Sequence, residues 1–456
     1  MSRVVAIVGG GITGLAAAYE LTTRGVSFVL LEASDRFGGL IHTDHVDGLT
    51  IESGADSMLA QKPAAIELCE ALGLGSRLIS TTLPRTAYIH ARGTLHPIPS
   101  PSIFGIPTTT EGIDAYALLT DAARARLKRN FDLPPRPAHG DESVADFFRR
   151  QFGDETVELI AEPLLGGIHA GDIERLSMAD VAPRLVQAEA QHGSVLRAFG
   201  QRGAGGALEG AFRSLRGGMG DLVKALIDAL PDGSLWPSSP VTSVSRGDGN
   251  WNVATSSNAF IAESVIVAVP AHRAAAMLAG SPAIASLCAK VPYVSTASVA
   301  LAWPRTQVPH ALSGTGFVVA RRHSRLRITA CSWVSSKWTG RAPDDVALLR
   351  VFVGGATDPE AARMGDDDLI GVAVHDVSAV LGMTTPPVLT RVHRWIDAGA
   401  QHNVGHGALM SQIDQRRAQE PGLFLAGSGF SAIGVPDCIA DGRNAAAAAA
   451  GYVKIQ

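Results

Sequence analysis

The chain has 456 residues, of which 46% are apolar, so it can bury a large core and we expect two or three domains. A formal net charge of -4 argues against nucleic acid as the main partner. The four cysteines are scattered without CxxC spacing, which is typical of reduced thiols in a cytoplasmic enzyme and not of a disulfide or zinc framework.

The chain enters an apolar strand at Val4, which leaves no room for a charged region followed by a separate apolar region. We therefore expect no signal peptide. No uninterrupted apolar run reaches the roughly 18 residues that a membrane-spanning helix needs. The sequence thus predicts a soluble, cytoplasmic protein, or one attached to a membrane surface.

The first 32 residues predict a strand, a helix and a second strand. Val4 to Val8 indicates a fully buried strand that breaks at three glycines. A helix is expected from about Ile12 to Arg24, with Gly25 as its stop. Val26 to Leu31 then indicates a second buried strand, which completes one βαβ unit.

The next segments predict a hairpin and a long helical region. Residues 42–53 surround Asp47-Gly48, a pair that suits a tight primed turn. From about Leu118 to Phe212 the apolar residues recur with a period of 3.6, which is typical of helices. Strand patterns return near residues 240, 251 and 265 and again from about Thr296 to Val353. A helical region between strand-rich regions predicts a discontinuous α/β domain with other domains threaded through it.

The glycines after the first strand have the spacing of a dinucleotide-binding turn. Gly9 would make the tight turn, Gly11 would let the backbone approach a pyrophosphate, and Gly14 would let helix and strand pack closely. Glu32 closes the next strand and can accept hydrogen bonds from both ribose hydroxyls. A lone GxGxxG is a weak signal, but here strand, turn, helix, strand and acid follow in the expected order.

The residues after Glu32 narrow the choice of nucleotide. Arg36 precedes Gly38-Gly39, and a second glycine turn there would let the chain double back over the pyrophosphate, with Arg36 as hydrogen-bond donor. This arrangement resembles the FAD-binding signature of the amine-oxidase-like flavoproteins. Arg36 taken alone could equally be a solvated surface arginine.

A closer resemblance extends along essentially the whole chain. The segments "ESGADSMLAQKP", "FFRRQFGDE", "EPLLGGIHAGDIERLSM", "LLRVFVGGA" and "GVPDCI" are similar, in the same order, to segments of bacterial HemY-type porphyrinogen oxidases. The resemblance implies an α/β multidomain fold: a Rossmann-like FAD-binding domain (1–58, 210–285 and 395–456), a β-sheet substrate domain (59–109 and 286–394) and an inserted helical domain (110–209).

Carried over residue by residue, the resemblance implies a set of FAD contacts, to which we add Arg36 and Gly39. Val241 would contribute only its backbone, and Trp395 could equally be plain core. The predicted cofactor-binding residues are Gly9, Gly10, Gly11, Ile12, Thr13, Gly14, Glu32, Ala33, Arg36, Gly39, Leu40, Gly54, Ala55, Asp56, Ser57, Val241, Trp395, Val435, Pro436 and Asp437.

The C-terminal stretch "GFSAIGVPDCIADGR" would form the second half of this site. Pro436 suits the first turn of a helix from about Asp437, whose positive end would face the pyrimidine edge of the flavin. Asp437 can cap that helix or bond the ribityl chain, and both alternatives stay open. Cys438 raises the question of covalent attachment, but the resemblance implies non-covalent FAD.

The sequence departs from the family pattern at three places. Ala55 stands where the family commonly has proline, and His169 and His402 each stand where a tyrosine is common. The two histidines replace aromatic residues that shape the cavity, which puts the fine specificity in doubt. His42, His169, His402 and His406 are candidate bases, but a lone histidine is more often structural and we assign none of them, nor any other side chain, a catalytic role.

The implied reaction is the oxidation of coproporphyrinogen III by FAD and dioxygen, with hydride passing from meso carbons to flavin N5 and hydrogen peroxide as a product. A porphyrinogen is an apolar disc with carboxylates on its rim, so it needs an apolar slot with basic residues at the edge. Lys62 is the best candidate for a propionate partner, with Arg85, Arg184 and Arg197 as weaker ones. Leu164, Leu165 and Ile168 could line the slot, although plain core packing is about as frequent.

Four readings of the function stay open. Protoporphyrinogen IX would undergo the same chemistry with two propionates instead of four. A flavin amine oxidase should show an aromatic pair beside the flavin, against which His402 speaks weakly. A non-catalytic relative could use the fold as a binding scaffold, but this chain keeps both ends of the FAD signature. Peripheral contact with a membrane surface and contact with a downstream enzyme of haem synthesis also stay open, and the sequence does not predict the oligomeric state.

Overall fold

The computed structural model describes residues 4–137, 140–200 and 210–455. Its first sheet is parallel throughout, with strand order β12-β2-β1-β16-β22, and its strands come from three separated parts of the chain. The apolar run of β1 fits a central strand that is buried on both faces. The strand bounds are β1 (Val4–Val8), β2 (Ser27–Leu31), β12 (Leu235–Trp236), β16 (Ser264–Val267) and β22 (Leu423–Leu425).

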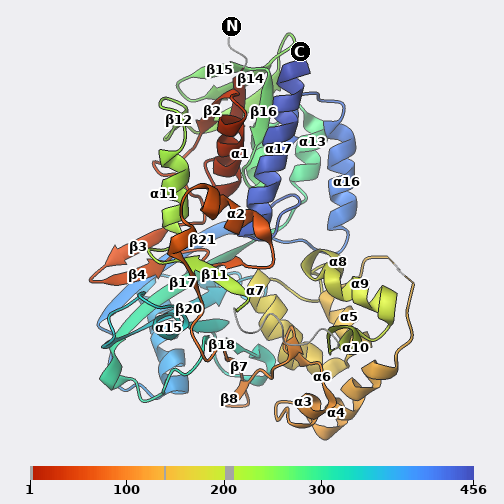
Figure 1. Ribbon diagram of the computed structural model, residues 1–456, viewed down its shortest axis with the longest axis vertical. Coiled ribbons are helices and arrows are strands. Elements are labelled where there is room, and N and C mark those ends of the chain that lie inside the picture. Colours follow the sequence, from red (N-terminus) through yellow and green to blue (C-terminus); the bar gives the residue numbers. More distant parts are fainter. Residues whose placement is uncertain (1–3, 138–139, 201–209, 456) are drawn as a thin grey trace.

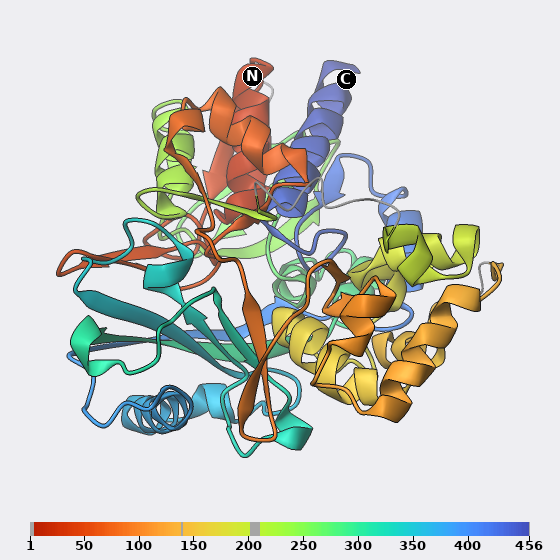
Figure 2. The same ribbon diagram turned by 60° about the horizontal axis from the view of Figure 1, so that its bottom comes forward.

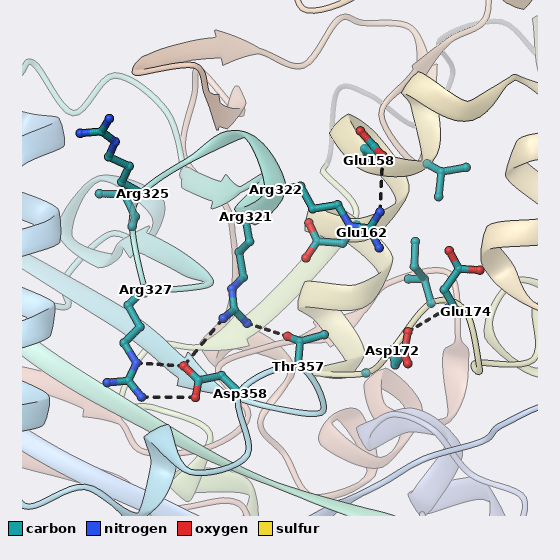
Figure 3. A pocket seen from close by; sticks show the side chains of 14 residues that line it. Glu158, Glu162, Asp172, Glu174, Arg321, Arg322, Arg325, Arg327, Thr357 and Asp358 are labelled. Carbon is teal, nitrogen blue, oxygen red and sulfur yellow. Dashed lines mark hydrogen bonds and ion pairs between the residues drawn. The ribbon is translucent and has the colours of Figure 1, made fainter.

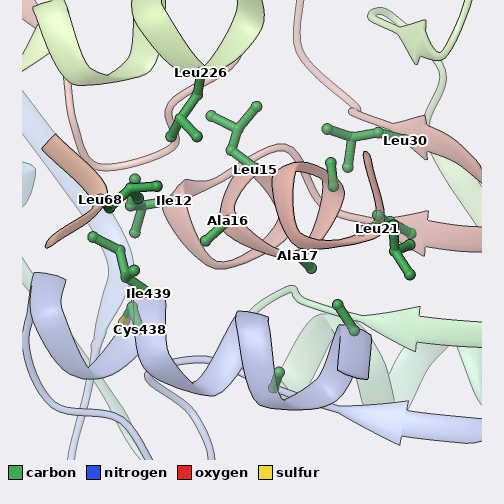
Figure 4. Close-up of a cluster of buried hydrophobic side chains, with 14 of the residues drawn as sticks. Ile12, Leu15, Ala16, Ala17, Leu21, Leu30, Leu68, Leu226, Cys438 and Ile439 are labelled. Carbon is green, nitrogen blue, oxygen red and sulfur yellow. The ribbon is translucent and has the colours of Figure 1, made fainter. Parts of the chain in front are cut away.

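Two helices from opposite ends of the chain cover this sheet. Helix α1 (Ile12–Thr23) and helix α17 (Val435–Ile455) lie side by side, as Figure 1 shows. Their small residues permit the close approach: a Cβ on Gly442 would lie 2.1 Å from the carbonyl oxygen of Thr13. Figure 4 shows the core around them, where Ala16 of α1 and Ile439 of α17 are buried. The predicted helix from Ile12 is confirmed, with Arg24 as its C-cap.

Two small antiparallel units connect this sheet to the rest of the molecule. The predicted hairpin is confirmed as β3 (Thr43–Val46) and β4 (Leu49–Glu52), with positive φ angles of 50° at Asp47 and 76° at Gly48 in its turn. A three-stranded sheet has the order β5-β11-β6. Its strands are β5 (Met58–Leu59), β11 (Phe212–Leu215) and β6 (Leu78–Ser80).

A second large sheet has seven strands in the order β21-β17-β20-β19-β18-β7-β8. All its pairings are antiparallel except β18 with β7. Helix α15 (Asp366–Leu381) packs on one face of this sheet, as Figure 2 shows. Three aspartates in its first turn complement the positive end of the helix dipole. The strands are β7 (Ala87–Ala91), β8 (Thr94–Pro97), β17 (Tyr293–Pro304), β18 (Gly316–Val319), β19 (Ala330–Trp333), β20 (Val346–Gly354) and β21 (Leu389–Ala400).

The helical region lies beside the seven-stranded sheet, as Figure 2 shows. Ser143 caps α5 by accepting a hydrogen bond of 3.0 Å from the backbone N–H of Asp146. A π-helical segment, η3, contains Pro163, an interruption often found at functional sites. The elements are α3 (Thr110–Asp114), α4 (Asp121–Lys128), η2 (Arg129–Asp132), α5 (Val144–Gln151), α6 (Asp154–Thr156), η3 (Val157–Gly166), α7 (Gly167–His169), α8 (Met178–Val181), α9 (Pro183–His192) and α10 (Val195–Gly200).

The end predicted for the helical region is wrong. Phe212 begins β11 and pairs with Leu59, because residues 212–215 complete a ladder between β5 and β6. Residues 201–209 of the predicted helical domain, like 138–139 within it and 1–3 of the FAD-binding domain, lie outside the described part. Strand β21 runs across the boundary expected at residue 395, and the domain limits themselves stay a prediction.

The remaining elements surround the first sheet and the loops between the two sheets. The expected strand patterns near residues 240 and 251 are confirmed as part of an antiparallel unit β13-β14-β15. In the described part of the chain, we find no helix long and apolar enough to cross a membrane. These elements are α2 (Pro63–Ala71), η1 (Gly75–Arg77), β9 (Ser102–Ile103), β10 (Ile106–Pro107), α11 (Gly220–Asp228), β13 (Val241–Arg246), β14 (Trp251–Thr255), β15 (Ala259–Ala262), α12 (Ala271–Met277), α13 (Pro282–Cys288), η4 (Arg305–Gln307), η5 (Arg321–His323), α14 (Val334–Lys337), η6 (Ala361–Arg363) and α16 (His406–Arg417).

Candidate cofactor and substrate site

The glycine turn between β1 and α1 leaves backbone open to a ligand. A Cβ on Gly14 would lie 1.9 Å from the carbonyl oxygen of Gly9, so that position can hold only glycine without a backbone shift. At Gly11 the nearest atom to such a Cβ is the Cα of Gly39, 4.0 Å away. Gly11 also starts α1 without a side-chain cap, and the first turn carries no acid. The free N–H groups of α1 therefore suit a pyrophosphate.

Glu32 and the second glycine turn close over the first. The Glu32 carboxylate accepts a hydrogen bond of 2.7 Å from the Gly10 N–H and bonds of 2.8 Å from the backbone N–H and hydroxyl of Ser34. Oε2, which accepts only the bond from Gly10, has further acceptor capacity for a ribose hydroxyl. The Arg36 guanidinium donates to the Gly39 carbonyl over 2.8 Å. Arg36 thus holds its own turn, and its contact with a pyrophosphate stays a prediction.

The C-terminal helix meets this turn from the other side. Pro436 lies in the first turn of α17, as expected, and the Asp437 carboxylate accepts a hydrogen bond of 3.1 Å from the backbone N–H of Gly434. The structure therefore supports the capping alternative for Asp437. Asp441, which the sequence analysis did not single out, holds the neighbouring loop by accepting a bond of 2.7 Å from the Gly427 N–H.

Cys438 is buried between α17 and α1. Its thiol is hydrogen-bonded to Thr13, and burial raises the pKa of the thiol to about 11. A thiol with a raised pKa is protonated at neutral pH, and only the thiolate is a strong nucleophile. The protonated Cys438 thiol is therefore a weak nucleophile.

Segment Ser53–Ser57 forms the third wall of the candidate site. Three side chains converge on the carbonyl oxygen of Ser53: Trp395 Nε1 donates over 2.7 Å, Arg350 over 2.8 Å and the Ser298 hydroxyl over 3.3 Å. A Cβ on Gly54 would lie 1.8 Å from the Leu40 carbonyl oxygen. Trp395 thus has a defined role, because it anchors the segment on β21.

Beneath this segment lies a cluster of buried charges that the sequence analysis missed. Lys337 forms an ion pair of 2.6 Å with Asp56, and Arg341 lies 3.3 Å from Glu52. Burial alone would raise the pKa of Asp56, but Lys337 and Arg350 outweigh it and hold this pKa well below its usual range. The partners are about 280 residues apart in sequence, so no local pattern could have revealed them.

The predicted propionate partners do not all gather in one place. Lys62 is 46% exposed and forms an ion pair of 2.6 Å with Asp437 at the start of α17. Arg184 donates to the side chain of the adjacent Gln61 over 2.7 Å. Arg85 donates to Thr81 near the three-stranded sheet. Arg197 instead donates to backbone carbonyls within the helical region, so the structure does not bring it to the others.

Of the residues predicted to line the substrate slot, one is exposed and the other two are packed in the core. Ile168 in α7 is 67% exposed, as expected for an apolar side chain at the edge of a cavity. Leu165 is 1% exposed and belongs to the core of the helical region, and Leu164 packs against that core. Core packing, the alternative left open by the sequence, therefore describes both leucines. Val241 begins β13 and pairs with Thr255.

Three of the four candidate histidines lie near one another, and one of them, His169, is also near Lys62. His402 and His406 are stacked with ring centroids 3.9 Å apart, and their Nε2 atoms donate to the carbonyls of Ser428 and Phe430. Burial, with smaller contributions from His402 and Lys62, lowers the pKa of His169 to about 4. His169 is therefore neutral at physiological pH. His42 lies apart from them, edge-on to His393.

A cavity of about 530 Å³ lies elsewhere, between η3 and the loop after β18. Its charged side chains are largely paired with one another: Arg327 and Arg321 both contact Asp358, and Arg322 contacts Glu158 (Figure 3). None of the predicted cofactor-binding residues lines it. We therefore do not assign the cofactor or the substrate to this cavity.

Fold and site together define a dinucleotide-binding oxidoreductase of the flavoprotein class. The chain belongs to the flavin containing amine oxidoreductase family, whose model matches residues 12–450, and within it to the HemY-type porphyrinogen oxidases. The resemblance seen in the sequence, and the α/β multidomain fold that it implied, are thereby confirmed.

Three relatives show how far the similarity extends. The coproporphyrinogen III oxidase of Bacillus subtilis (strain 168) is 36% identical over 464 residues, covering 98% of each chain. The coproporphyrinogen III oxidase of Propionibacterium freudenreichii subsp. freudenreichii is 33% identical, covering 96% of this chain and 89% of its own. A crystal structure from Exiguobacterium sp. 255-15, provisionally described as a protoporphyrinogen oxidase, matches with a TM-score of 0.90 at 32% identity over all of both chains.

Proposed function

We propose that this chain oxidises coproporphyrinogen III to coproporphyrin III in haem biosynthesis, with non-covalently bound FAD, with dioxygen as the electron acceptor and with hydrogen peroxide as its product. The observation that carries this proposal is the 36% identity to the Bacillus subtilis coproporphyrinogen III oxidase over 98% of both chains. This sequence similarity covers both the residues predicted to bind the nucleotide and those predicted to bind the substrate.

The residues on the nucleotide side fit FAD. Bound there, FAD would supply the hydride acceptor. The chain itself would hold the pyrophosphate at the N-terminus of α1 and the ribose at Glu32. Segment Ser53–Ser57, anchored by Trp395, would fix the position of the flavin ring. The buried, hydrogen-bonded thiol of Cys438 supports non-covalent attachment.

The residues on the substrate side fit an apolar molecule with carboxylates. Ile168 offers an exposed apolar side chain. Lys62 offers positive charge, and so does Arg184, which is hydrogen-bonded to Gln61, the residue before Lys62. Gln61, the bonding partner of Arg184, carries no charge, so this guanidinium can still pair with a carboxylate. The lowered pKa of His169 makes it a weak base, so we assign it no part in removing the pyrrole proton.

Protoporphyrinogen IX is the second candidate substrate. It is favoured by the description of the Exiguobacterium structure and by a more distant relative, the protoporphyrinogen oxidase 2 of Arabidopsis thaliana, which is 26% identical over 99% of this chain. The curated relatives between 31% and 36% identity, by contrast, are named coproporphyrinogen III oxidases. We therefore rank coproporphyrinogen III first.

The deciding experiment compares the two substrates without oxygen. Each porphyrinogen is mixed anaerobically with the purified holoenzyme, and the flavin absorbance near 450 nm, a region set by the cofactor itself, is followed in a stopped-flow instrument. We expect coproporphyrinogen III to bleach the flavin faster than protoporphyrinogen IX does. The reverse order would make the second candidate the substrate, and no bleaching by either would disprove the proposed function.

Three accompanying measurements test the rest of the proposal. Acid precipitation should leave the flavin in the supernatant, and a yellow pellet would show covalent attachment. After oxygen is admitted, hydrogen peroxide should appear in proportion to the porphyrin formed. The proposal includes a cytoplasmic location, and cell fractionation would show whether the protein also contacts a membrane surface.

A further inference from the structure

The buried cluster beneath segment Ser53–Ser57 contains more positive than negative charge. Its cations are Lys337, Arg341 and Arg350, and its acids are Glu52 and Asp56. With all five groups ionised, the cluster carries a net charge of +1. Asp221, which also attracts Arg341, is itself paired with Arg77 and so adds no free negative charge.

Most of this charge is withdrawn from water. Arg341 is 1% exposed, Arg350 6% and Glu52 5%, whereas the side chains of Lys337 and Asp56 are 16% and 25% exposed. Burial lowers the pKa of both arginines, which shows the cost of holding their charge there. A buried cation without a full countercharge is unfavourable by several kcal/mol. We therefore expect that a negative charge comes close to this cluster when a ligand occupies the candidate site.

The cluster itself has no room for that anion. The Nε atoms of Arg341 and Arg350 and the Nε1 atom of Trp338 are buried without a hydrogen-bond acceptor among the described residues. The adjoining cavity, lined by these residues and both acids, measures about 10 Å³. That volume suits at most one water molecule. The negative charge must therefore come from beyond the cluster.

The cluster directly contacts segment Ser53–Ser57. Arg350 donates to the Ser53 carbonyl, and Lys337 holds the side chain of Asp56. Gly54 lies against the ring of Trp395, and on the proposed function this surface receives the flavin. Two electrons and one proton, delivered together as a hydride, give the bound flavin one negative charge. That charge matches the excess in the cluster.

We propose that Lys337, Arg341 and Arg350 are the built-in countercharge of the reduced cofactor and raise its reduction potential, with Asp56 as the acid that limits the effect. They act through the segment they hold and are positioning residues, because none of them is placed at the reacting atoms. The proposal rests on the proposed function only in that it needs FAD bound at this site; it does not need a porphyrinogen.

A cycle of charge variants tests this proposal. The net charge of the cluster is +1 in the parent, 0 in Lys337→Met, +2 in Asp56→Asn and +1 again in the double variant. The midpoint potential of the bound flavin is measured anaerobically against a reference dye, with dithionite as the reductant. We expect Lys337→Met to lower the two-electron reduction equilibrium constant roughly tenfold, which is about 30 mV, and Asp56→Asn to raise it by a similar factor.

The double variant separates charge from structure. If charge sets the potential, the double variant returns to within about threefold of the parent, because its net charge is restored. If the ion pair matters only as a structural link, both single variants and the double variant shift in the same direction, which would overturn the proposal. Lys224→Met, at an exposed lysine paired with Asp228, is the matched control and should leave the potential unchanged.

Two further outcomes keep the test decisive. If Lys337→Met does not retain flavin, Asp56→Asn alone decides, since a raised potential supports the countercharge and an unchanged or lowered one overturns it. Because dithionite and the dye replace the substrate, the cycle can succeed in a protein that oxidises neither porphyrinogen. Failure of this inference and failure of the proposed function are thus distinguishable.

Discussion

The glycine turn at Gly9–Gly14 and segment Ser53–Ser57 lie in the same candidate site but are held in different ways. The close packing of the turn depends on backbone, because a Cβ on Gly9 or Gly14 would lie 2.5 or 1.9 Å from a carbonyl oxygen. One side chain, Glu32, also holds the turn through the Gly10 N–H. The segment depends on side chains from β17, β20 and β21, which converge on one carbonyl oxygen. A backbone-built wall can be recognised from a short motif, whereas a side-chain-built wall can be recognised only in the folded chain.

Removing the central side chain of the second wall should have the largest effect. Arg350→Met takes away a buried donor to Ser53 and a countercharge of Asp56. Losing a hydrogen bond from a charged donor in this way costs about 1.5–3 kcal/mol. We expect the free energy of unfolding, measured with urea, to fall by that amount. Arg391→Met, at an exposed arginine of the same sheet, should change it by less than about 0.5 kcal/mol.

An Arg350→Met variant as stable as the parent would contradict the view that buried side chains hold the second wall. It would mean that Trp395 and Ser298 suffice to hold the Ser53 carbonyl, and that the buried guanidinium is not needed for the second wall.

The first wall should respond to the addition of a single methyl group. In Gly14→Ala the new Cβ would meet the Gly9 carbonyl oxygen at 1.9 Å, so the turn or the helix must shift. Overpacking of this kind costs about 1–3 kcal/mol, and the shifted turn should no longer bind the pyrophosphate. We expect purified Gly14→Ala to be nearly colourless and to take up little added FAD.

The matched control uses a glycine with free space. Gly371 lies within α15, where a Cβ would meet nothing within 4 Å. Gly371→Ala should therefore keep its flavin and gain up to about 1 kcal/mol in stability. Full flavin content in Gly14→Ala would show that the first wall does not depend on this close approach.

The same contrast explains what could be predicted from the sequence. The βαβ unit, the hairpin at Asp47-Gly48 and the start of α17 near Pro436 depend on local backbone preferences, and all three are confirmed. Phe212 was assigned to a helix because its strand is defined only by partners more than 130 residues earlier. Lys337 and Arg350 were overlooked because no spacing in the sequence connects them with Asp56.

The substrate side shows an intermediate case. Lys62 was singled out by its charge, but only the folded chain shows that it is paired with Asp437 at the start of α17. Ile168 and Leu165 are three residues apart in sequence, yet Ile168 is exposed and Leu165 is buried. The residue types indicated which kinds of group could contact the substrate. Only the fold shows which of these residues are exposed and which are buried or already paired.

The last prediction concerns His169 and the pH dependence of stability. Burial, with His402 and Lys62 nearby, lowers its folded-state pKa to about 4, below the ordinary value of 6.5. Between these two pH values the unfolded chain binds a proton that the folded chain does not, so the free energy of unfolding falls as the pH falls. His169→Gln removes this contribution. We expect its urea-unfolding free energies, measured at pH 4.5, 5.5, 6.5 and 7.5, to vary less steeply with pH than those of the parent, and an equally steep dependence would show that His169 is solvated in the folded chain.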